Sequence, residues 1–471
     1  MTLGAQTVAS RLSDIAGAPN FIADPAQLLR YEIDSTRPSA AIRPSSAAEI
    51  VEILKFAASE KLAVIPVGAR TKLSIGLPPR QYDLALDVTR LNRILAYDPG
   101  DLTLSVEAGV PLCQLQSALS EHGQFLPLAV PFMEKTTAGG TIASGVDSPL
   151  RQAFGTARDF VLGMEFVTGD GESAKSGGRV VKNVTGYDLH KLMIGSLGTL
   201  GIITKINFRT FPQPIAPRGF VAHFPASKAA LEMRSRLSQS PLRPLTLEIF
   251  GPRAADQFSS EAAAHIAKSP MEANPLSGDH WAFTTGFAGN DAVRARYETE
   301  LTRMANDCGA AAISILSDAR LASAWARKRE FIPIALASAS AATIIRIGVH
   351  PSRMEDALNH AGAAAEASTL SWVAMARGAG VIYFAILPEE SSEPEDPEIC
   401  VRVLAAARRI QSEIQNLGGN FSIPWCPASW KAAFADLIWG PAPAELAQMQ
   451  KLKRVFDPQA VLSPGRFVGG I

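Results

Sequence analysis

The chain lacks the features that mark several large protein classes. Among its 471 residues there are only four cysteines, and no two form a C-x-x-C pair: Cys113, Cys308, Cys400 and Cys426. Structural zinc and iron–sulfur sites need ligands that lie closer together, so we expect inert thiols and no metal site. No apolar run reaches the roughly 18–20 residues of a membrane-spanning helix. The N-terminus also lacks the basic start and apolar core of a signal peptide, so we expect a cytoplasmic protein without membrane insertion.

An excess of charge of either sign is missing as well. Lys and Arg together number 45, and Asp and Glu together also number 45. This balance favours neither nucleic acid nor an anionic membrane as a partner. Hydrophobic residues make up 47% and charged residues 19%, which is a globular composition. A chain of this length predicts more than one domain.

The first part of the chain alternates between helix and strand patterns. Ser46 followed by Glu49 has the spacing of a capping box, and apolar residues then recur on one helical face. Short apolar strands follow at "LAVIPVG", "YDLALDV" and "TLSVEAGV", with a helix at "PLCQLQSALSEHG". "VLGMEFVTGDGESAKSG" predicts a hairpin that turns at Asp170-Gly171. The alternation predicts an α/β domain.

The proline-rich run "FPQPIAPRG" predicts a boundary near Pro212. Beyond it, we expect strands at "TLEIF", "WAFTTGF", "ATIIRIGVH", "LSWVAMA" and "VIYFAIL". Alanine-rich helices are expected at 227–238, 291–305, 352–367 and 399–418. The pattern predicts a second α/β domain with a mainly antiparallel sheet. The acidic run "PEESSEPEDPE" predicts an exposed loop.

Three glycine-rich segments could approach a ligand through the main chain: "PVGARTKLSIG" (66–76), "TTAGGTIASG" (136–145) and "GGRVVKNVTGYDLHKLMIGSLGTLGIITKI" (177–206). Glycine permits positive φ and lets amides converge on an anion. None of the three is a Walker loop or a Rossmann G-x-G-x-x-G motif. Taken singly each could be an ordinary turn, so spacing alone indicates only a phosphate-bearing ligand. The roles of Arg179 and Lys182 stay open.

The order of these segments resembles the FAD-binding domain of the vanillyl-alcohol oxidase and p-cresol methylhydroxylase (PCMH-type) superfamily. "FDPQAVLSPGR" is similar to the C-terminal return of such proteins, so the resemblance covers roughly 35–212 and 450–467. It implies an α+β protein with a PCMH-type FAD-binding domain of two α/β subdomains over 1–215, whose core is about 35–212. A cap or substrate domain over 216–448 and a C-terminal segment over 449–471 that returns to the FAD domain would complete it.

The resemblance also implies roles for individual residues in binding FAD. The first loop would bind the pyrophosphate, and the start of the second segment would face the pyrophosphate or the ribityl chain, with Ser144 and Gly145 nearer the isoalloxazine. Gly155 and Thr156 would lie near the adenosine half, and residues 201–203 would meet the flavin or the adenine through main-chain groups. The implied cofactor-binding residues are Pro66, Gly68, Ala69, Arg70, Thr71, Lys72, Ala138, Gly139, Gly140, Thr141, Ser144, Gly145, Gly155, Thr156, Arg158, Gly201, Ile202 and Ile203. The first loop contains no histidine or cysteine, so we expect non-covalent FAD. Arg158 and Asp159 are expected to pair with each other.

"GGRVVKNVTGYDL" and "GSLGTLG" resemble the FAD-binding subunit of glycolate oxidase most closely. The catalytic subunit of that complex usually has glutamate at the position of Leu197 and clustered histidines, whereas His350 and His360 stand apart here. The resemblance implies a 2-hydroxy-acid dehydrogenase complex in which electrons pass to an iron–sulfur subunit, with peripheral association at the inner membrane through partners. A free-standing oxidase or dehydrogenase and a non-catalytic flavin relay subunit stay open.

If the chain itself oxidises a 2-hydroxy acid, it needs a cation for the carboxylate and a base for the hydroxyl proton. Arg346, Arg377 and Arg466 are the candidate cations, and Tyr383 and His350 are the candidate bases. Trp325, Trp372 and Trp425 could wall the flavin. Side chains of these types more often have a structural role, so that reading stays open for each of them.

Overall fold

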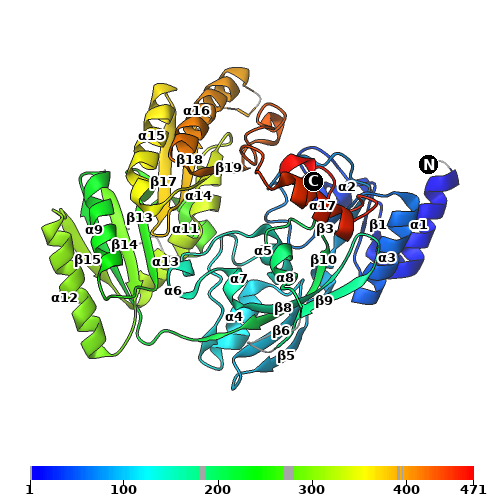
Figure 1. Ribbon diagram of the computed structural model, residues 1–471, viewed down its shortest axis with the longest axis horizontal. Coiled ribbons are helices and arrows are strands. Elements are labelled where there is room, and N and C mark those ends of the chain that lie inside the picture. Colours follow the sequence, from blue (N-terminus) through cyan, green and yellow to red (C-terminus); the bar gives the residue numbers. More distant parts are fainter. Residues whose placement is uncertain (1–2, 180–185, 270–279, 390–392, 395) are drawn as a thin grey trace.

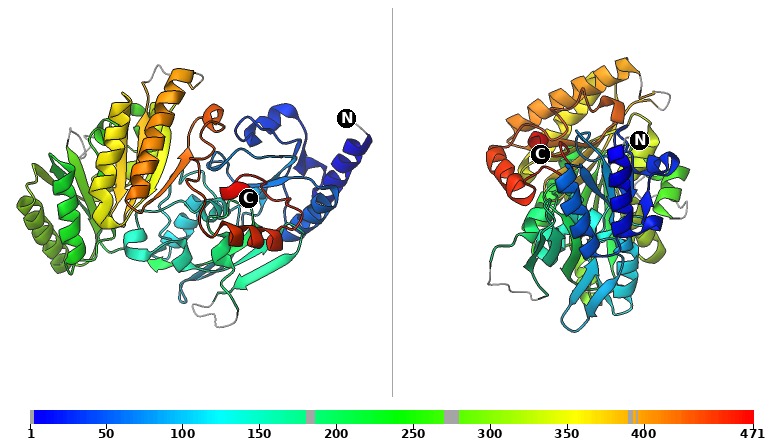
Figure 2. Two further views of the ribbon diagram at one scale, coloured as in Figure 1. Left: turned by 45° about the horizontal axis from the view of Figure 1, so that its top comes forward. Right: turned by 90° about the vertical axis from the view of Figure 1, so that its right-hand side faces the viewer.

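The computed structural model describes residues 3–179, 186–269, 280–389, 393–394 and 396–471. It has an N-terminal half with two main sheets and a second half built on one large sheet, and both termini lie on the N-terminal half (Figures 1 and 2). Lys182 and part of the acidic run lie outside the described residues. Arg179 is described, and its guanidinium donates to Thr103 Oγ1 at 3.3 Å.

The first sheet of the N-terminal half has four strands in the order β1-β2-β4-β3. Their bounds are Phe21–Ile22, Ala40–Ile42, Leu84–Asp87 and Val64–Val67. β2 and β3 both run parallel to β4, and β1 is antiparallel to β2. The helices of this part are α1 (Leu3–Ala16), α2 (Pro25–Leu28) and α3 (Ala47–Glu60). The helix predicted after Ser46 is confirmed: Ser46 accepts from the Glu49 amide, and α3 buries its apolar face.

The second sheet is antiparallel, with five strands in the order β5-β6-β10-β8-β9. Their bounds are Ile94–Asp98, Thr103–Glu107, Ile202–Arg209, Val161–Val167 and Ser173–Gly177. β8 and β9 form the predicted hairpin, in which Gly171 has φ +82°. The helices of this part are α4 (Leu112–Ser120), α5 (Ala138–Ser144), α6 (Arg151–Phe154), α7 (Ala157–Phe160) and α8 (His190–Met193). A two-stranded ribbon pairs β7 (Gln124–Phe125) with β11 (Phe211–Pro212).

The large sheet is antiparallel throughout and has eight strands in the order β15-β12-β14-β13-β17-β18-β16-β19. Their bounds, in the same order, are Ala312–Leu316, Arg218–Phe224, Trp281–Phe287, Thr246–Phe250, Ser371–Arg377, Val381–Leu387, Thr343–Gly348 and Asn420–Trp425. The mixed fold with a mainly antiparallel second sheet is therefore as predicted.

Helices cover both faces of the large sheet (Figure 1). The outer face carries α9 (Ser227–Gln239), α12 (Asp291–Asp307), α15 (Met354–Ala367) and α16 (Pro397–Asn416). The inner face carries α10 (Ala254–Phe258), α11 (Glu261–Ala267), α13 (Asp318–Arg329) and α14 (Phe331–Ser338). The inner-face cluster also includes Ile75, Phe132, Val146 and Leu197, all from the N-terminal half. The inner face of the large sheet is therefore turned toward the three glycine-rich segments.

The C-terminal segment packs back onto the N-terminal half. Helix α17 (Leu446–Phe456) is followed by residues that join the cluster under the four-stranded sheet. The Val64 amide donates to Val461 O at 2.8 Å, and the Ser463 amide donates to Val64 O at 2.9 Å. Lys453 donates to Thr199 O at 2.8 Å and pairs with Asp457 at 2.6 Å. The end of the chain therefore contacts the glycine-rich elements directly.

Candidate functional site

A groove that is open to solvent lies between the loop that follows β3, helix α5 and the start of β10. Thirteen of the residues singled out in the sequence line it: Pro66, Gly68, Ala69, Arg70, Thr71, Lys72, Gly139, Gly140, Ser144, Gly201, Ile202, Ile203 and Arg466. Seven other lining residues lie within the three glycine-rich segments: Val67, Leu73, Thr136, Thr137, Ala143, Leu197 and Gly198. Sequence reasoning missed Ile65, Val88 and Ala108, which lie outside these segments.

The loop after β3 presents unsatisfied main-chain donors to this groove. In the part of the chain that the structure describes, the amides of Ala69, Arg70 and Thr71 donate to no protein acceptor. Arg70 has φ +66°, a left-handed conformation that a side chain rarely adopts without compensation. The left-handed residue lies in a turn, and in such a turn successive amides can converge on a common point, which is the geometry of an anion-binding nest.

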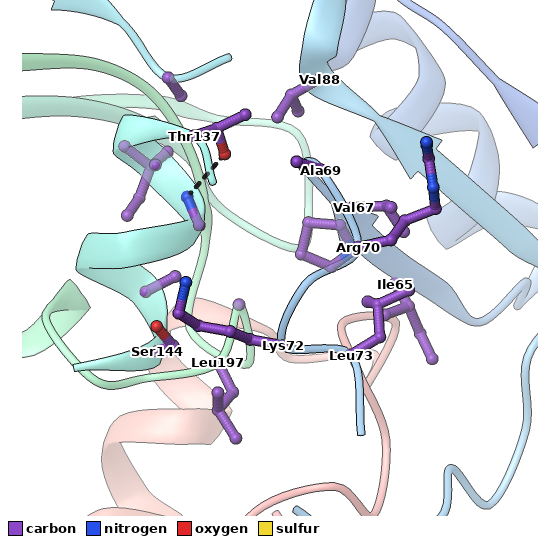
Figure 3. A pocket seen from close by; sticks show the side chains of 18 of the residues that line it. Ile65, Val67, Ala69, Arg70, Lys72, Leu73, Val88, Thr137, Ser144 and Leu197 are labelled. Atoms are coloured by element: carbon purple, nitrogen blue, oxygen red, sulfur yellow. Dashed lines mark hydrogen bonds between the residues drawn. The ribbon is translucent and has the colours of Figure 1, made fainter. Parts of the chain in front are cut away.

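The side chain of Arg70 points away from Lys72, toward the four-stranded sheet (Figure 3). Its Nη1 lies 3.5 Å from Asp87 Oδ2, and its guanidinium lies over the Tyr31 ring at 5.5 Å. Tyr31 donates to the same carboxylate at 2.7 Å. The burial of Tyr31 and the charge on Asp87 raise its pKa to about 12. The Arg70 side chain therefore holds the loop in place, while its main chain faces the groove.

Two groove glycines have no space for a side chain. A Cβ on Gly139 would come within 2.7 Å of Ala108 Cβ, and a Cβ on Gly198 would overlap the Pro66 ring. Gly198 also has φ +71°. The main chain at both positions is thus packed against neighbouring elements, and the groove wall is built from backbone atoms.

Two buried cations from the distal part of the sequence hold the carbonyls of the same loop. Arg466 Nη2 donates to Leu73 O and Ile75 O at 2.5 Å each. Lys431 Nζ donates to Asp34 Oδ2 at 2.8 Å, to Gly76 O at 2.8 Å and to Ser74 O. With the carbonyls of 73–76 fixed on this side, the preceding amides stay free to face the groove. Arg466, a candidate cation for the substrate in the sequence, thus binds the carbonyls of the loop. Lys431 was not among the candidate residues.

Lys72 lines the groove and is 9% exposed. Its Nζ donates to Thr136 Oγ1 at 2.7 Å and lies 3.4 Å from Thr71 Oγ1. In Figure 3 its side chain crosses from the loop toward α5 and Ser144. Desolvation lowers the pKa of Lys72 to about 7, although the charge on Glu330 acts to raise it. The sequence alone could not distinguish this placement from exposure to solvent.

Three candidate catalytic residues lie on adjacent strands of the large sheet. Arg346 of β16 pairs in register with Tyr383 of β18, and Tyr383 pairs with Met375 of β17, two positions before Arg377. The alternation of a strand turns Arg346 to the same face as Ile344, and Tyr383 and Ile344 both belong to the inner-face cluster. The three side chains are therefore directed toward the N-terminal half.

Of the two arginines on these strands, Arg377 has carboxylate partners and Arg346 has none among the described residues. Arg377 pairs with Glu248, and its Nε lies 3.7 Å from Asp147 Oδ2. Glu248 is completely buried and also pairs with Lys328 at 3.1 Å. Arg346 has no carboxylate partner within the described residues, and the Tyr383 hydroxyl is its hydrogen-bond partner. Arg346 is thus the candidate whose charge is left for a ligand.

The electrostatics of Tyr383 disfavour its role as a base. Burial raises its pKa, and Asp147 raises it further, against smaller opposing effects of Arg346 and Arg377. Its hydroxyl therefore stays protonated at neutral pH; it accepts from Arg346 and keeps its own proton available to donate. His350 is exposed, and its Nδ1 shares a hydrogen bond with the Ser352 hydroxyl at the start of a short 3-10 helix. Neither position favours proton abstraction.

Several sequence-predicted residues do not line the groove. Ala138, Thr141 and Gly145 belong to α5 or its C-cap, and Thr141 is buried beside Thr136. Gly155 and Thr156 form the turn before α7. Arg158 donates to Lys191 O at 2.9 Å and lines a separate groove. The expected pairing of Arg158 with Asp159 is wrong, because Asp159 accepts from the Thr156 amide and hydroxyl instead.

The three tryptophans considered as flavin walls also lie away from the groove. Trp372 stacks on Phe384, Trp425 is buried in the inner-face cluster, and Trp325 lies over Lys328. Among the described residues, no cluster of three His, Cys, Asp or Glu could hold a metal ion. No described helix has the length and apolarity needed to cross a bilayer.

Comparisons with known proteins match both parts of the chain. A family model described as "FAD binding domain" matches residues 38–177, and one described as "FAD linked oxidases, C-terminal domain" matches 216–467. The chain is 29% identical to D-2-hydroxyglutarate dehydrogenase of Xanthomonas citri over 455 residues, which is 94% of this chain and 93% of that protein. It is 39% identical to glycolate oxidase subunit GlcE of Escherichia coli over 168 residues, 36% of this chain and 47% of that subunit.

The solved structure of p-cresol methylhydroxylase with substrate bound matches 99% of this chain and 97% of its own, with a TM-score of 0.78 and 18% identity. At this identity the match establishes the fold, which is that of the PCMH-type flavoproteins. The predicted fold class and the predicted cofactor FAD are both confirmed.

The groove fits the chemistry of FAD. Unsatisfied amides at Ala69 to Thr71 suit the pyrophosphate, and a backbone wall at Gly139 and Gly198 suits a flat ring system. Two buried cations, Lys72 and Arg466, line the groove without a carboxylate within ion-pair distance in the described chain. A dianionic cofactor would supply the missing negative charge.

Proposed function

The chain belongs to the FAD-linked oxidases, and from this premise we propose that it oxidises the CH–OH group of a small 2-hydroxy acid. When bound, FAD supplies the two-electron acceptor for such a reaction. The substrate would lie between the groove and the inner face of the large sheet. In this proposal the FAD-binding unit consists of residues 1–215 and 449–471, and the cap consists of residues 216–448.

The observation that carries the proposal is the position of Arg346. It extends from β16 toward the N-terminal half, and among the described ion pairs no carboxylate neutralises it. A guanidinium in this state suits a substrate carboxylate, which it can bind through two parallel hydrogen bonds. The Tyr383 hydroxyl beside it stays protonated and is suited to donate to an oxygen of the same substrate.

Similarity to D-2-hydroxyglutarate dehydrogenase over 94% of the chain supports a hydroxy acid as the substrate class. The test is steady-state oxidation of D-2-hydroxyglutarate, lactate and glycolate with an artificial electron acceptor. Arg346→Leu should raise KM for the acid by roughly 30-fold or more, which corresponds to about 2 kcal/mol for a lost charge-assisted contact. Arg346→Lys should recover part of this loss. An unchanged KM in Arg346→Leu would contradict the proposal.

We further propose that FAD is held without a covalent bond, because none of the described groove residues is a histidine, cysteine or tyrosine. Precipitation with acid should leave the flavin in the supernatant. Flavin that stays on the precipitated chain would refute this.

We also propose that the electrons leave through an iron–sulfur partner, with a second, catalytic flavin subunit beside it in a glycolate oxidase-like complex. Similarity to GlcE, named as a subunit, supports a complex, and this chain has only four dispersed cysteines of its own. Affinity purification from the native cell should then retain an iron-containing protein. Rapid oxygen consumption by the isolated chain would instead favour a free-standing oxidase.

A further inference from the structure

The charges around Lys72 do not balance within the protein. Its ammonium group has three donors, yet its described hydrogen-bond partners are only the Thr136 hydroxyl at 2.7 Å and the Thr71 hydroxyl at 3.4 Å. The ammonium also lies 5.8 Å from the centre of the Phe132 ring, which is uncharged. A buried cation normally has a carboxylate partner, because desolvation of a lone charge is costly. A negative counter-charge for Lys72 could therefore come only from a ligand in the groove.

The neighbouring charged groups are already engaged. Glu330, from the junction of α13 and α14, accepts from the Phe132 amide at 2.7 Å and pairs with Arg329 at 2.9 Å. On the loop itself, Arg70 pairs with Asp87. From the C-terminal segment, Arg466 contributes a second positive charge that is held by carbonyls. No histidine or cysteine is present among the described groove residues.

We propose that Lys72 takes up a proton from solvent when the negatively charged cofactor enters the groove, so that its ammonium becomes the counter-charge of the cofactor inside the protein. The step adds one proton to the amine and changes no other bond. The inference rests on FAD as the cofactor and is independent of the substrate.

The expected pH dependence follows from linkage. Without cofactor the pKa of Lys72 is about 7, and a nearby anion raises it. Below this value the side chain is already protonated, so binding takes up no proton. Above it, binding takes up close to one proton, and FAD affinity falls by about tenfold per pH unit until the raised pKa is reached.

The test is calorimetric titration of FAD into apoprotein at pH 8 in two buffers of different ionisation enthalpy, which counts the protons taken up. The wild type should take up about one proton per FAD. Lys72→Arg is the matched control, because arginine stays charged; it should bind FAD with no proton uptake and with affinity independent of pH. Lys72→Met should also show no uptake, and a lower affinity at pH 6.

The wild-type titration needs no variant, so the inference stays testable if Lys72→Met folds poorly. FAD binding by the wild type without net proton uptake at pH 8 would overturn the inference and leave the cofactor assignment intact. Proton uptake that persists in Lys72→Met would also overturn it, by assigning the proton to another group. Absence of any FAD binding would overturn the cofactor assignment and the inference together.

Discussion

Lys431→Met should weaken FAD binding although Lys431 does not line the groove. Its Nζ lies in a site where the side chains of Lys431 and Asp34 are 1% and 2% exposed, and it holds the carbonyls of Ser74 and Gly76. Removing one partner of a buried ion pair typically costs about 3–5 kcal/mol, because the other charge stays buried and unpaired. A hydrogen bond from a charged donor contributes roughly 1.5–3 kcal/mol.

If about half of one such bond serves to hold the loop in its binding geometry, the Kd for FAD should rise by about tenfold. Flavin fluorescence titration of apoprotein measures this, and thermal unfolding measures the accompanying loss of stability. Lys328→Met is the matched control: it breaks another buried lysine–carboxylate pair, with Glu248 at 3.1 Å, in the large sheet. It should destabilise the protein while leaving FAD affinity within about twofold of the wild type.

The double variant Asp34→Asn/Lys431→Met separates the two effects. Without the unpaired carboxylate, stability should partly recover, whereas FAD affinity should stay low because the loop carbonyls still lack their donor. If Lys431→Met binds FAD as tightly as the wild type, the claim that this lysine positions the loop is wrong.

Three more changes give separate expectations. Gly198→Ala should lower FAD affinity by at least tenfold, since the new Cβ overlaps the Pro66 ring at positive φ; unchanged fluorescence titration would argue against the packed backbone wall. Tyr383→Phe should lower kcat/KM for the acid by roughly tenfold with a flat effect from pH 6 to 8, because the hydroxyl acts as a donor; a lost acidic limb in the pH profile would show a base instead. For Glu248, burial alone would raise the pKa, but its two neighbouring cations lower it overall. Its stabilising contribution is therefore present above the ordinary carboxyl pKa and is lost as pH falls through the depressed value. Glu248→Gln should lower the free energy of unfolding at pH 7, and its difference from the wild type should become smaller in acid.

Most long helices and buried strands of the large sheet could be predicted because their apolar residues repeat with the period of the element. The buried strand β12 was not predicted, since it directly follows the proline-rich boundary. α12, α15 and α16 each bury one stripe, and β18 is buried along its whole length. β15 was missed because it is an edge strand in which every residue except Leu316 is exposed or half-buried. β19, the other edge strand, contains Pro424, which weakens its strand signal.

The main-chain part of the groove could be predicted because its glycines lie in short segments that can be recognised from local sequence alone. The side chains could not, because their environment comes from distant segments. Lys72 is buried by Thr136 and lies near Glu330, far along the chain. Lys431 is the single lysine of the mostly apolar run "PASWKAAFADLIW", but the run also contains Asp436, so its sequence does not distinguish a buried lysine from an exposed one.

Anaerobic addition of D-2-hydroxy acids to the purified single chain, followed by its visible spectrum, shows directly whether this chain oxidises such an acid. The spectrum of bound flavin should bleach with the preferred acid in the wild type and should bleach far more slowly at the same acid concentration in Arg346→Leu. A chain that carries full FAD and is bleached by dithionite but by none of the 2-hydroxy acids would contradict the proposed function.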